Sequence, residues 1–371
     1  MIYLDHHAAT PLAPGVRLAM DEARDGGWAN PSSVHAAGRR ARSILDRTRE
    51  RLGATIEARP ADLVLTGGGT EACNLAILGI GRHVRRIVTT GVEHPAVSAP
   101  IAALERAGLE VLRLDVPDGI VPPPAALALH ADERTLVALT WVNHETGNVL
   151  SVEDYSGACR RVGALLFVDA TQALGKVPTS VRRAGAHAIA VASHKMGGPA
   201  GAGALWLSPT VVMDPQLLGG EQERGRRAGS PDVIAAAGFG AACELVPGRI
   251  AAVAQVAVLR DRLEASVVAL GGRVNGAGAP RVGTVTSDSF EGRRGAELVV
   301  ALDLLGVCAS SGAACSSGRG GPSAVVAAMY PEEPWRAAAA LRLSLGPETT
   351  PEEVEAAARA LGQVLGRVDL A

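Results

Sequence analysis

Lysine is almost missing from this chain of 371 residues. Only Lys176 and Lys195 are lysines, and arginine supplies the other positive side chains. Arginine replaces lysine at most surface positions, but it cannot form an imine with an aldehyde, because that reaction needs an amine that can lose its proton. Each lysine is therefore a candidate for chemistry, and the alternative for either one alone is a chance surface position.

The chain also lacks an excess of charge and a long apolar run. Its 36 basic and 38 acidic residues give a formal charge of −2 and an isoelectric point near 6.5. No long basic block occurs, so charge gives no support for nucleic-acid binding. No apolar run reaches the roughly 18 residues of a membrane span, so we expect no membrane segment. Residues 1–14 have neither a basic start nor an apolar core, so we expect no signal peptide.

Cysteine is scarce as well. The chain has five cysteines and no CxxC pair, which predicts free thiols in a reducing cytoplasm. Zinc-ligand spacing is missing too, because the pair His144-Glu145 is not followed by the second histidine of an HExxH motif and no cysteine cluster occurs. We therefore expect no metal site.

What the sequence does contain is an alternation of apolar, β-rich runs with Ala-, Leu- and Arg-rich helical stretches. The runs are nearly continuous in apolar residues, as in parallel sheets that are buried on both faces. The alternation predicts an α/β fold with a mostly parallel sheet covered by helices. The predicted strands are 63–66, 86–90, 110–114, 136–141, 165–170, 188–193 and 203–207, and the helices between them include 71–81, 96–107 and 153–163.

The pattern changes after about residue 248. A long helix is predicted over 249–270, followed by an extended stretch at 281–290, a helix over 295–306 and a second extended stretch at 340–346. A last helix follows, and Thr350 could cap its N-terminus. These elements predict a smaller α+β lobe.

A glycine loop at residues 67–69 connects the first of these strands to a helix. Its glycines, including Gly69, allow backbone N–H groups to approach an anion, the helix N-terminus adds positive potential, and Thr70 adds a hydroxyl. The loop matches neither dinucleotide nor nucleoside-triphosphate motifs, so it favours one small phosphate. The alternative is a tight turn that needs glycine.

Two neighbouring predicted strands end in polar residues. Asp169 closes one strand and is followed by Gln172, and the next strand ends at Ser193, His194 and Lys195. In open α/β sheets, ligands bind beyond the carboxyl ends of the strands, although an acid there could also be a helix cap. An imine-forming lysine beside an acid and a phosphate loop is what pyridoxal phosphate requires.

One further strand ends near His94, which could stack on the cofactor ring or move protons. A lone histidine is more often structural, and only its convergence with the residues above favours a role in the site.

A cysteine in a loop rich in serine and glycine raises a separate question. Cys315 lies in "SSGAACSSGRGGPSAVV", residues 310–326. Cysteine is usually buried, so the loop predicts either a tolerated surface thiol or a nucleophile that moves. Of the other cysteines, Cys308 is expected as a core residue of a strand, and Cys73 and Cys159 as structural residues of helices.

Ten segments, in order, resemble those of the cysteine desulfurases. This family belongs to the pyridoxal-phosphate enzymes of fold type I, with the aspartate-aminotransferase fold. The resemblance covers nearly the whole chain and includes the subgroup's long cysteine loop. The segments are "YLDHHAATPL", "NPSSVHAAGRRAR", "LTGGGTEACNLAI", "VEHPAV", "NHETG", "VDATQALGKVP", "SHKMGGPAGAGALW", "GGEQERGRRAGSPD", "SSGAACSS" and "LRLSLGPETT".

The resemblance implies a large cofactor-binding domain over 13–248, with a seven-stranded sheet. It implies a small domain over 1–12 and 249–371 that carries the cysteine loop. The catalytic residues would be Lys195, Cys315 and His94. The cofactor would be bound by Gly69, Thr70, His94, His144, Asp169, Gln172, Ser193, His194, Lys195 and Ser230, and the substrate carboxylate by Asn30 and Arg342.

Several positions depart from the family pattern. The segment "HHAAT" replaces one that is usually richer in asparagine and threonine, and the loop tip "SSGRGG" is richer in glycine than usual. His144 stands where the family usually has an asparagine that reaches the cofactor's ring hydroxyl, and Ser230 replaces a threonine that contacts the phosphate across the dimer. Lys176 is a family position without a chemical role. The departures predict a specialised member of the family.

The resemblance implies conversion of L-cysteine to L-alanine by ketimine chemistry on pyridoxal phosphate, which leaves a persulfide on Cys315. It also implies a cytoplasmic homodimer and a protein sulfur acceptor, in iron–sulfur cluster assembly or a thiolation pathway. Direct contact with nucleic acid or membrane is not expected. The alternatives are a C–S or C–Se lyase or an aminotransferase on the same fold, and a non-catalytic scaffold or regulatory partner.

Overall fold

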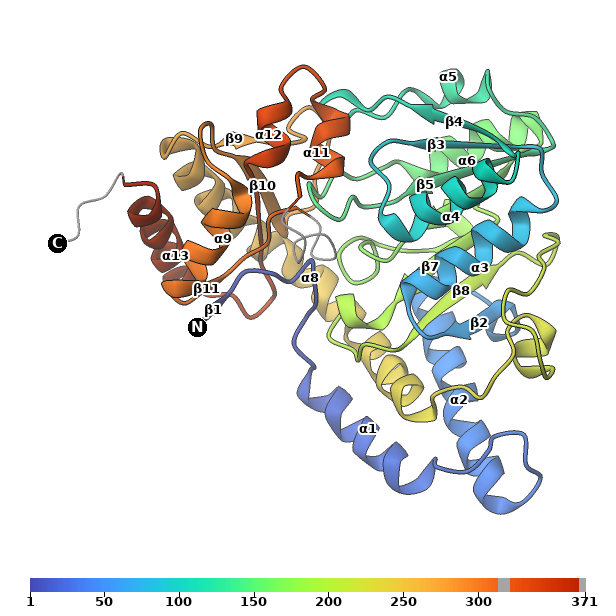
Figure 1. The fold of residues 1–371 in the computed structure, drawn as a ribbon. Coiled ribbons are helices and arrows are strands. Elements are labelled where there is room, and N and C mark those ends of the chain that lie inside the picture. Colours follow the sequence, from blue (N-terminus) through green and yellow to red (C-terminus); the bar gives the residue numbers. More distant parts are fainter. Residues whose placement is uncertain (313–320, 367–371) are drawn as a thin grey trace.

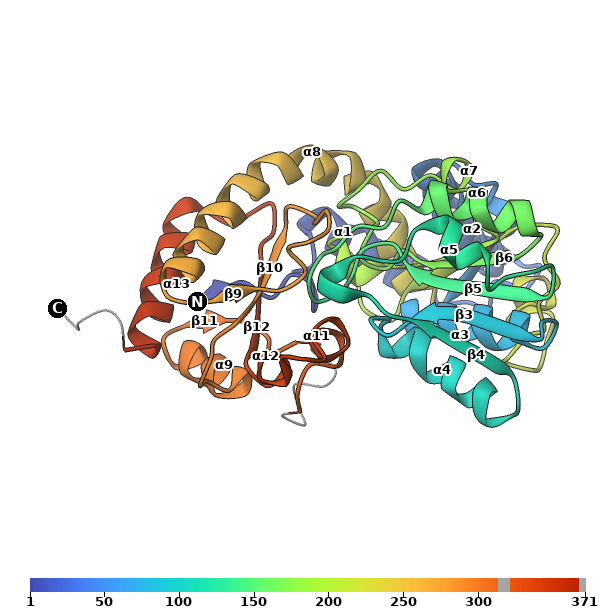
Figure 2. The same ribbon diagram turned by 90° about the horizontal axis from the view of Figure 1, so that it is seen from above.

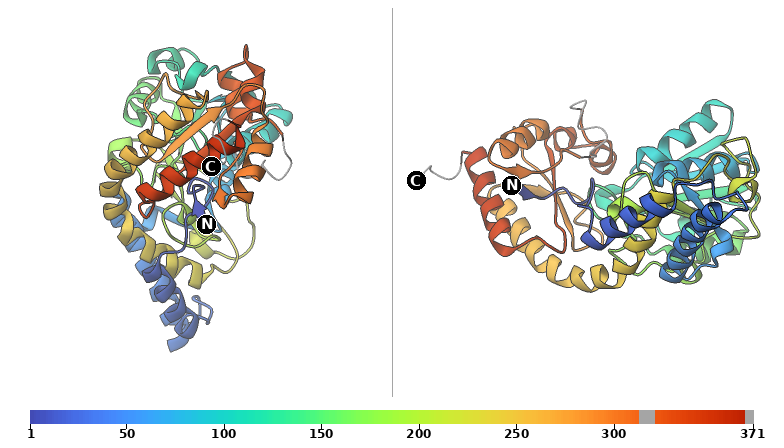
Figure 3. Two further views of the ribbon diagram at one scale, coloured as in Figure 1. Left: turned by 90° about the vertical axis from the view of Figure 1, so that its left-hand side faces the viewer. Right: turned by 90° about the horizontal axis from the view of Figure 1, so that it is seen from below.

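The computed structural model describes residues 1–312 and 321–366, which form two lobes (Figure 1). A large sheet with its helices makes one lobe, and a smaller α+β layer makes the other. Both the first strand and the last helix belong to the small lobe (Figure 3). Cys315 lies outside the described residues, so its place in the structure stays a prediction.

The large sheet has seven strands in the order β2-β8-β7-β6-β5-β3-β4. All run parallel except β8, which is antiparallel to both β2 and β7. The seven predicted strands are confirmed, with ends shifted by at most one residue. Their bounds are β2 Leu63–Thr66, β3 Arg86–Thr90, β4 Glu110–Leu114, β5 Thr135–Thr140, β6 Leu165–Asp169, β7 Ala188–Ala192 and β8 Gly203–Leu207.

Both faces of this sheet are buried, which explains the continuous apolar strands. In β2, Leu63 and Leu65 join an apolar cluster with α1, α2 and α6, whereas Val64 joins the opposite cluster with α3 and α4. Successive side chains of a strand point to opposite faces, so every position must be apolar. The helices are α1 Pro14–Gly26, α2 Ala36–Ile56, α3 Gly69–Gly81, α4 Pro95–Arg106, α5 Pro124–Ala128, α6 Val152–Val162 and α7 Val181–Ala184.

The small lobe is built on a three-stranded antiparallel sheet in the order β12-β10-β9, beside a parallel pair of β1 and β11. Its own apolar cluster joins Leu4 of the N-terminal segment to residues between 256 and 365. The elements are β1 Ile2–Tyr3, β9 Arg273–Val274, β10 Val285–Ser289, α9 Gly295–Leu304, β11 Val307–Cys308, α11 Ala324–Met329, α12 Pro334–Ala338, β12 Ala340–Ser344 and α13 Pro351–Val364. Short 3-10 turns occur at Pro60–Asp62, Pro117–Gly119, Ser193–Lys195 and Gln222–Gly225.

The lobes are connected by α8, Val233–Ala269, a long curved helix that runs from one to the other (Figure 2). The predicted start at residue 249 is wrong. The helix begins after Asp232, whose side chain accepts a hydrogen bond from the Ala235 N–H, and it continues through Pro247. Proline usually ends a helix, but contacts of the preceding turns with α1 and α2 stabilise this one. The expected domain boundary at 248/249 therefore falls inside a helix, and the division into domains stays a prediction.

Within the described ranges, α8 is long and apolar enough, by length and composition alone, to cross a membrane. No single run of apolar residues had indicated this, because Glu244 and Arg249 interrupt it. The helix packs on α1, α2 and α13, and a core helix meets the same criterion. The finding is therefore weak as an indication of a membrane segment.

Two smaller expectations about single residues have opposite outcomes. Thr350 caps α13 as predicted: its hydroxyl accepts from the Glu353 N–H, and the Glu353 carboxylate accepts from the Thr350 N–H. Cys308 does lie in a strand, but it is partly exposed and is not a core residue. Among the described residues, the strand β11 is only two residues long and pairs with β1, so it lies outside the three-stranded sheet of the small lobe.

Candidate active site

A cavity of about 130 Å³ lies at the carboxyl ends of the large sheet's strands. Two larger cavities, of about 510 and 370 Å³, lie elsewhere, so chemistry rather than size selects this one. Its walls collect nine of the predicted site residues from six separate stretches of chain. These are Gly69, Thr70, His94, His144, Asp169, Gln172, His194, Lys195 and Arg342.

Lys195 ends the 3-10 turn that follows β7 and is partly buried. Its Nζ donates hydrogen bonds to the backbone carbonyls of His7, at 2.6 Å, and Ala8, at 2.8 Å. The N-terminal segment therefore holds the amine at the cavity wall. An amine fixed in this way can react with an aldehyde that enters the cavity.

Asp169 ends β6 and is buried, with 5% of its surface exposed. Its Oδ1 accepts a hydrogen bond from the Thr171 N–H at 2.9 Å. Burial and the neighbouring Asp169 raise the pKa of the Cys73 thiol well above its usual value. Cys73 therefore stays a neutral thiol beside Asp169.

The N-terminus of α3 opens onto the same cavity. The cap residue, Gly68, has φ of 142°, a conformation that favours glycine, and no side chain caps the helix. Gly69 and Thr70, the first two helical residues, line the cavity. Free N–H groups at a helix N-terminus bind anions, so this end of the cavity suits a phosphate.

His94 and His144 lie against each other edge to face, with ring centroids 4.7 Å apart. Burial is the largest cause that lowers the pKa of each ring, so both are neutral near pH 7. The Ala96 N–H donates to Nδ1 of His94, which leaves the ring proton of His94 on Nε2. The buried Nδ1 of His144 has no hydrogen-bond partner within the described part of the chain, so a polar group in the cavity could satisfy it.

Arg342 lies on β12 of the small lobe and is 1% exposed. Its Nη2 donates to Oδ1 of Asp5 at 2.7 Å, and its Nη1 donates to the carbonyl of His144 at 3.0 Å. Its buried Nε is left without a partner among the residues that the structure describes. The guanidinium thus brings a cation from the small lobe to the cavity of the large lobe.

The described residues on both sides of the cysteine loop are bonded close to this cavity. Before the loop, the Ser310 hydroxyl donates to Oδ2 of Asp5 at 2.9 Å. After the loop, the Ser323 hydroxyl donates to Oε2 of Glu145 at 2.5 Å, and Glu145 directly follows His144. Both ends of the loop therefore start from residues that touch the site.

Three predicted residues do not line this cavity. Ser193 is fully buried beneath it, and its Oγ has no partner within the described ranges. Asn30 and Ser230 line the cavity of about 510 Å³ instead, at the connection between α1 and α2 and the loop before α8. Within one chain, Asn30 and Arg342 therefore lie at separate cavities.

Sequence reasoning missed the residues that hold the site together. Asp5 pairs with Arg342, and the carbonyls of His7 and Ala8 receive Lys195. The only signal was that the segment "HHAAT" departs from the family pattern. Nothing in its local pattern could have placed it against residues that follow nearly 190 positions later or more.

This fold and this site define a class of enzyme. The aminotransferase class-V family matches residues 2–357, so the chain belongs to the class-V aminotransferases. An IscS-like cysteine desulfurase of Mycobacterium tuberculosis is 39% identical over 99% of this chain and 97% of its own. A cysteine desulfurase of Cereibacter sphaeroides is 39% identical over 95% of this chain and 93% of its own. Within its class, the chain is a cysteine desulfurase.

Solved structures give the same answer for the fold. A NifS-like protein superposes with a TM-score of 0.91 at 27% identity, over 99% of this chain and 100% of that protein. The structure of SspA in complex with cysteine has a TM-score of 0.82 at 26% identity, over 94% of this chain and 100% of that protein. The predicted family and the type I fold are confirmed.

Proposed function

We propose that this cysteine desulfurase uses pyridoxal phosphate, bound in the 130 Å³ cavity, to convert L-cysteine to L-alanine. The observation that carries the proposal is one cavity with Lys195, Asp169 and the open N-terminus of α3 on its walls. These provide an amine for the aldehyde, a carboxylate for the pyridine nitrogen and N–H donors for the phosphate.

The residues present fit this cofactor. Gly69, Thr70 and His194 line the cavity and would hold the phosphate. The buried Ser193 Oγ, which has no partner within the described ranges, would be a further contact. His94 would stack on the ring, while His144 and Gln172 lie where they could bond a ring hydroxyl; the unpartnered Nδ1 of His144 supports this role. When bound, pyridoxal phosphate supplies the aldehyde and an electron-withdrawing ring that stabilises negative charge at the substrate's Cα.

Protons are moved by groups that the chain itself holds in place. Lys195 Nζ would remove the proton from Cα of the substrate and return it, because its amine is held at the cavity wall. Asp169 would keep a proton on the ring nitrogen of the bound cofactor. His94 is neutral, with its proton on Nε2, so it can donate that proton in the site.

The substrate carboxylate would bind to Arg342. The unpartnered Nε of this guanidinium, at the cavity, supports the role, and the pair with Asp5 fixes its orientation. L-Cysteine as substrate is supported by the similar SspA structure, which was solved with cysteine. Asn30 would assist only from a second copy of the chain, since it lines another cavity.

Cys315 would accept the sulfur. Its thiolate Sγ attacks the substrate's sulfur, the S–S bond forms, and the Cβ–S bond breaks. The electron pair goes to Cβ, which takes up a proton to give alanine. A persulfide stays on Cys315 for a protein acceptor in iron–sulfur cluster assembly or a thiolation pathway, in the cytoplasm.

The test is to load the purified protein with pyridoxal phosphate, add L-cysteine and a thiol reductant, and measure alanine and sulfide. Cys315→Ala should lower alanine formation by about 100-fold or more, because the nucleophile is lost. Cys308→Ala is the matched control, since Cys308 is a partly exposed cysteine of the small lobe outside the cavity and should keep parental turnover. Equal alanine from parent and Cys315→Ala, or pyruvate in place of alanine, would identify a lyase instead.

A further inference from the structure

The second lysine of the chain lies behind the first. Lys176 is 8% exposed, and its Nζ donates to Oε1 of Gln172 at 2.8 Å. Nε2 of Gln172 in turn donates to the carbonyl of His7 at 2.7 Å, the same carbonyl that Lys195 contacts. The only two lysines of the sequence are therefore joined through one glutamine and one backbone carbonyl.

These contacts fix the orientation of the Gln172 amide. A carboxamide has one oxygen that accepts and one NH₂ group with two hydrogens to donate. Rotation of the amide by half a turn would place its oxygen against the His7 carbonyl oxygen and its NH₂ against the Lys176 amine. The two facing oxygens would repel each other in either protonation state of Lys176, and a charged Lys176 would offer the NH₂ no acceptor, so the observed orientation is favoured.

The fixed amide decides what Gln172 presents to the site. Lys176 donates to its oxygen, which keeps a second lone pair, and one of its two N–H groups donates to the His7 carbonyl. Gln172 lines the active-site cavity, so its second N–H can donate to a ligand there. The fixed amide can thus supply a hydrogen-bond donor to the cavity.

We propose that Lys176 is a positioning residue, which holds the Gln172 amide so that it donates a hydrogen bond to the phenolic oxygen of the bound cofactor. This inference rests on the proposed function, because it assigns a donor to the same cofactor. A donor at this position stabilises the ionised oxygen of the ring and raises the affinity of the apoprotein for the cofactor.

The cost of burying Lys176 supports a role beyond packing. An amine transferred from water into the interior loses hydration, and an apolar side chain of the same length would be the cheaper core residue. No carboxylate lies within ion-pair distance of Lys176 in the ranges 1–312 and 321–366, where its bonded partner is Gln172. Burial and nearby cations, Lys195 first, lower its pKa well below the usual value. In either protonation state the amine keeps an N–H to donate.

Arg249 provides a matched control. It lines the same small cavity as Lys176, and its positive charge contributes to the lowered pKa of Lys176. It makes no contact with Gln172 that would fix the amide. Arg249→Met therefore removes a neighbouring positive charge and leaves the Lys176–Gln172 bond intact.

The experiment compares the parent with Lys176→Met, Gln172→Ala, the double variant and Arg249→Met. For each protein, two quantities are measured: the dissociation constant of pyridoxal phosphate from the apoprotein, and the ratio of the cofactor's visible and near-ultraviolet absorbance bands at fixed pH. Denaturant unfolding of the apoproteins shows that each variant is folded. The band ratio reports ionisation of the cofactor, which a purely structural role of Lys176 would not change.

We expect Lys176→Met to weaken cofactor binding by about tenfold and to change the band ratio in the same direction as Gln172→Ala. The double variant should match Gln172→Ala alone, since Lys176 acts through Gln172. Arg249→Met should match the parent.

Three results would overturn the inference while the proposed function stands. Lys176→Met could bind the cofactor as the parent does, the effects of the two substitutions could add in the double variant, or Arg249→Met could change binding as much as Lys176→Met. A parent protein that binds no pyridoxal phosphate would instead overturn the proposed function, and this inference with it.

Discussion

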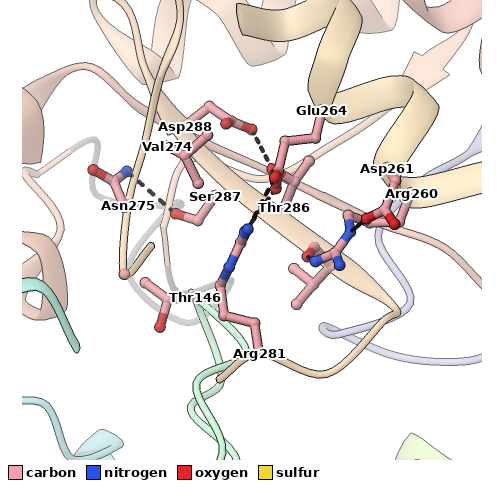
Figure 4. A network of polar contacts seen from close by, with 12 residues as sticks. Thr146, Arg260, Asp261, Glu264, Val274, Asn275, Arg281, Thr286, Ser287 and Asp288 are labelled. Carbon is pink, nitrogen blue, oxygen red and sulfur yellow. Dashed lines mark hydrogen bonds and ion pairs between the residues drawn. The ribbon is translucent and has the colours of Figure 1, made fainter. Parts of the chain in front are cut away.

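Asp288 is an acid that the small lobe buries completely, on β10 (Figure 4). The Thr286 hydroxyl lies 2.9 Å from its Oδ2 and 2.8 Å from Oε2 of Glu264, which in turn pairs with Arg281. One hydroxyl has one proton to donate. Glu264 accepts it, so a protonated Asp288 must donate to the oxygen of Thr286. Burial, the largest cause, raises the pKa of Asp288 to about 8.

This raised pKa predicts a pH dependence of stability. Its ordinary value is 3.8, so between pH 3.8 and about 8 the folded protein holds a proton that the unfolded chain has released. The free energy of unfolding therefore falls as the pH rises through this range, by at most about 1.4 kcal/mol per pH unit from this group. Asp288→Asn should remove that slope, because the amide stays neutral and can still donate to Thr286.

Urea unfolding at several pH values between 5 and 8 measures the slope. The groups that face Asp288 are Glu264 and Arg281, with Arg260 on α8 nearby, and all three are unchanged in the variant. Asp303→Asn, at an exposed acid of α9, is the control and should keep the parental slope. An unchanged slope in Asp288→Asn would show that Asp288 is ionised in the folded protein.

At the scale of a single element, α13 depends on its cap. The reciprocal bonds between Thr350 and Glu353 satisfy two backbone N–H groups at the helix start. Buried residues of this helix, such as Leu361, belong to the core of the small lobe. Fraying of its first turn would therefore loosen that core.

Thr350→Ala should lower the free energy of unfolding by about 1 kcal/mol, as is usual for loss of an N-cap. Denaturant unfolding measures the change. Thr350→Ser keeps the hydroxyl and should recover most of the loss. If serine were as destabilising as alanine, packing of the threonine methyl rather than capping would be the cause.

The elements also explain how far the sequence could predict the fold. The strands of the large sheet were predictable because burial on both faces requires unbroken apolar runs. In β6 and β7, for example, no proline or glycine interrupts the run. The start of α8 was not, because Pro247 is a strong local signal that a helix stops. Tertiary contacts with α1 and α2 outweigh that signal, and no local pattern records them.

The site was predictable to the extent that strand ends are. Asp169 and Lys195 end adjacent parallel strands or the turn after one, so the topology alone brings them to one edge. The bond between Arg342 and Asp5 joins residues 337 positions apart, and the carbonyl of His7 acts through its backbone. Neither a spacing nor a side-chain type could indicate such contacts.

On the scale of the whole molecule, the large cavity around Asn30 and Ser230 supports the predicted homodimer. Two large apolar residues that are close in sequence to residues lining this cavity are exposed. Trp28 is 77% exposed and Leu218 is 82% exposed. Large apolar side chains that are exposed in one chain are typical of an interface when they gather in a patch. A second copy would cover them and could bring Asn30 and Ser230 to its partner's cofactor.

Trp28→Asp should therefore raise the dimer dissociation constant by about tenfold or more, since a charge would be buried in the interface. Light scattering over a dilution series measures it. Leu304→Asp is the control: Leu304 is 83% exposed, on α9 of the small lobe, and should leave the dimer intact. A dimer that resists Trp28→Asp but dissociates in Leu304→Asp would move the interface to the small lobe.

The N-terminal segment has a consequence for the order in which the enzyme is made. Residues 2–8 are synthesised long before their partners, since Ile2 pairs with Val307 and the His7 N–H donates to the Ser344 hydroxyl. The large sheet can form during translation, because its strands all precede residue 208. The carbonyls that hold Lys195 gain their own support only after Ser344 has emerged. A nascent chain would thus carry a folded sheet with an unfinished site, and reactive chemistry would be delayed until β12 has been synthesised.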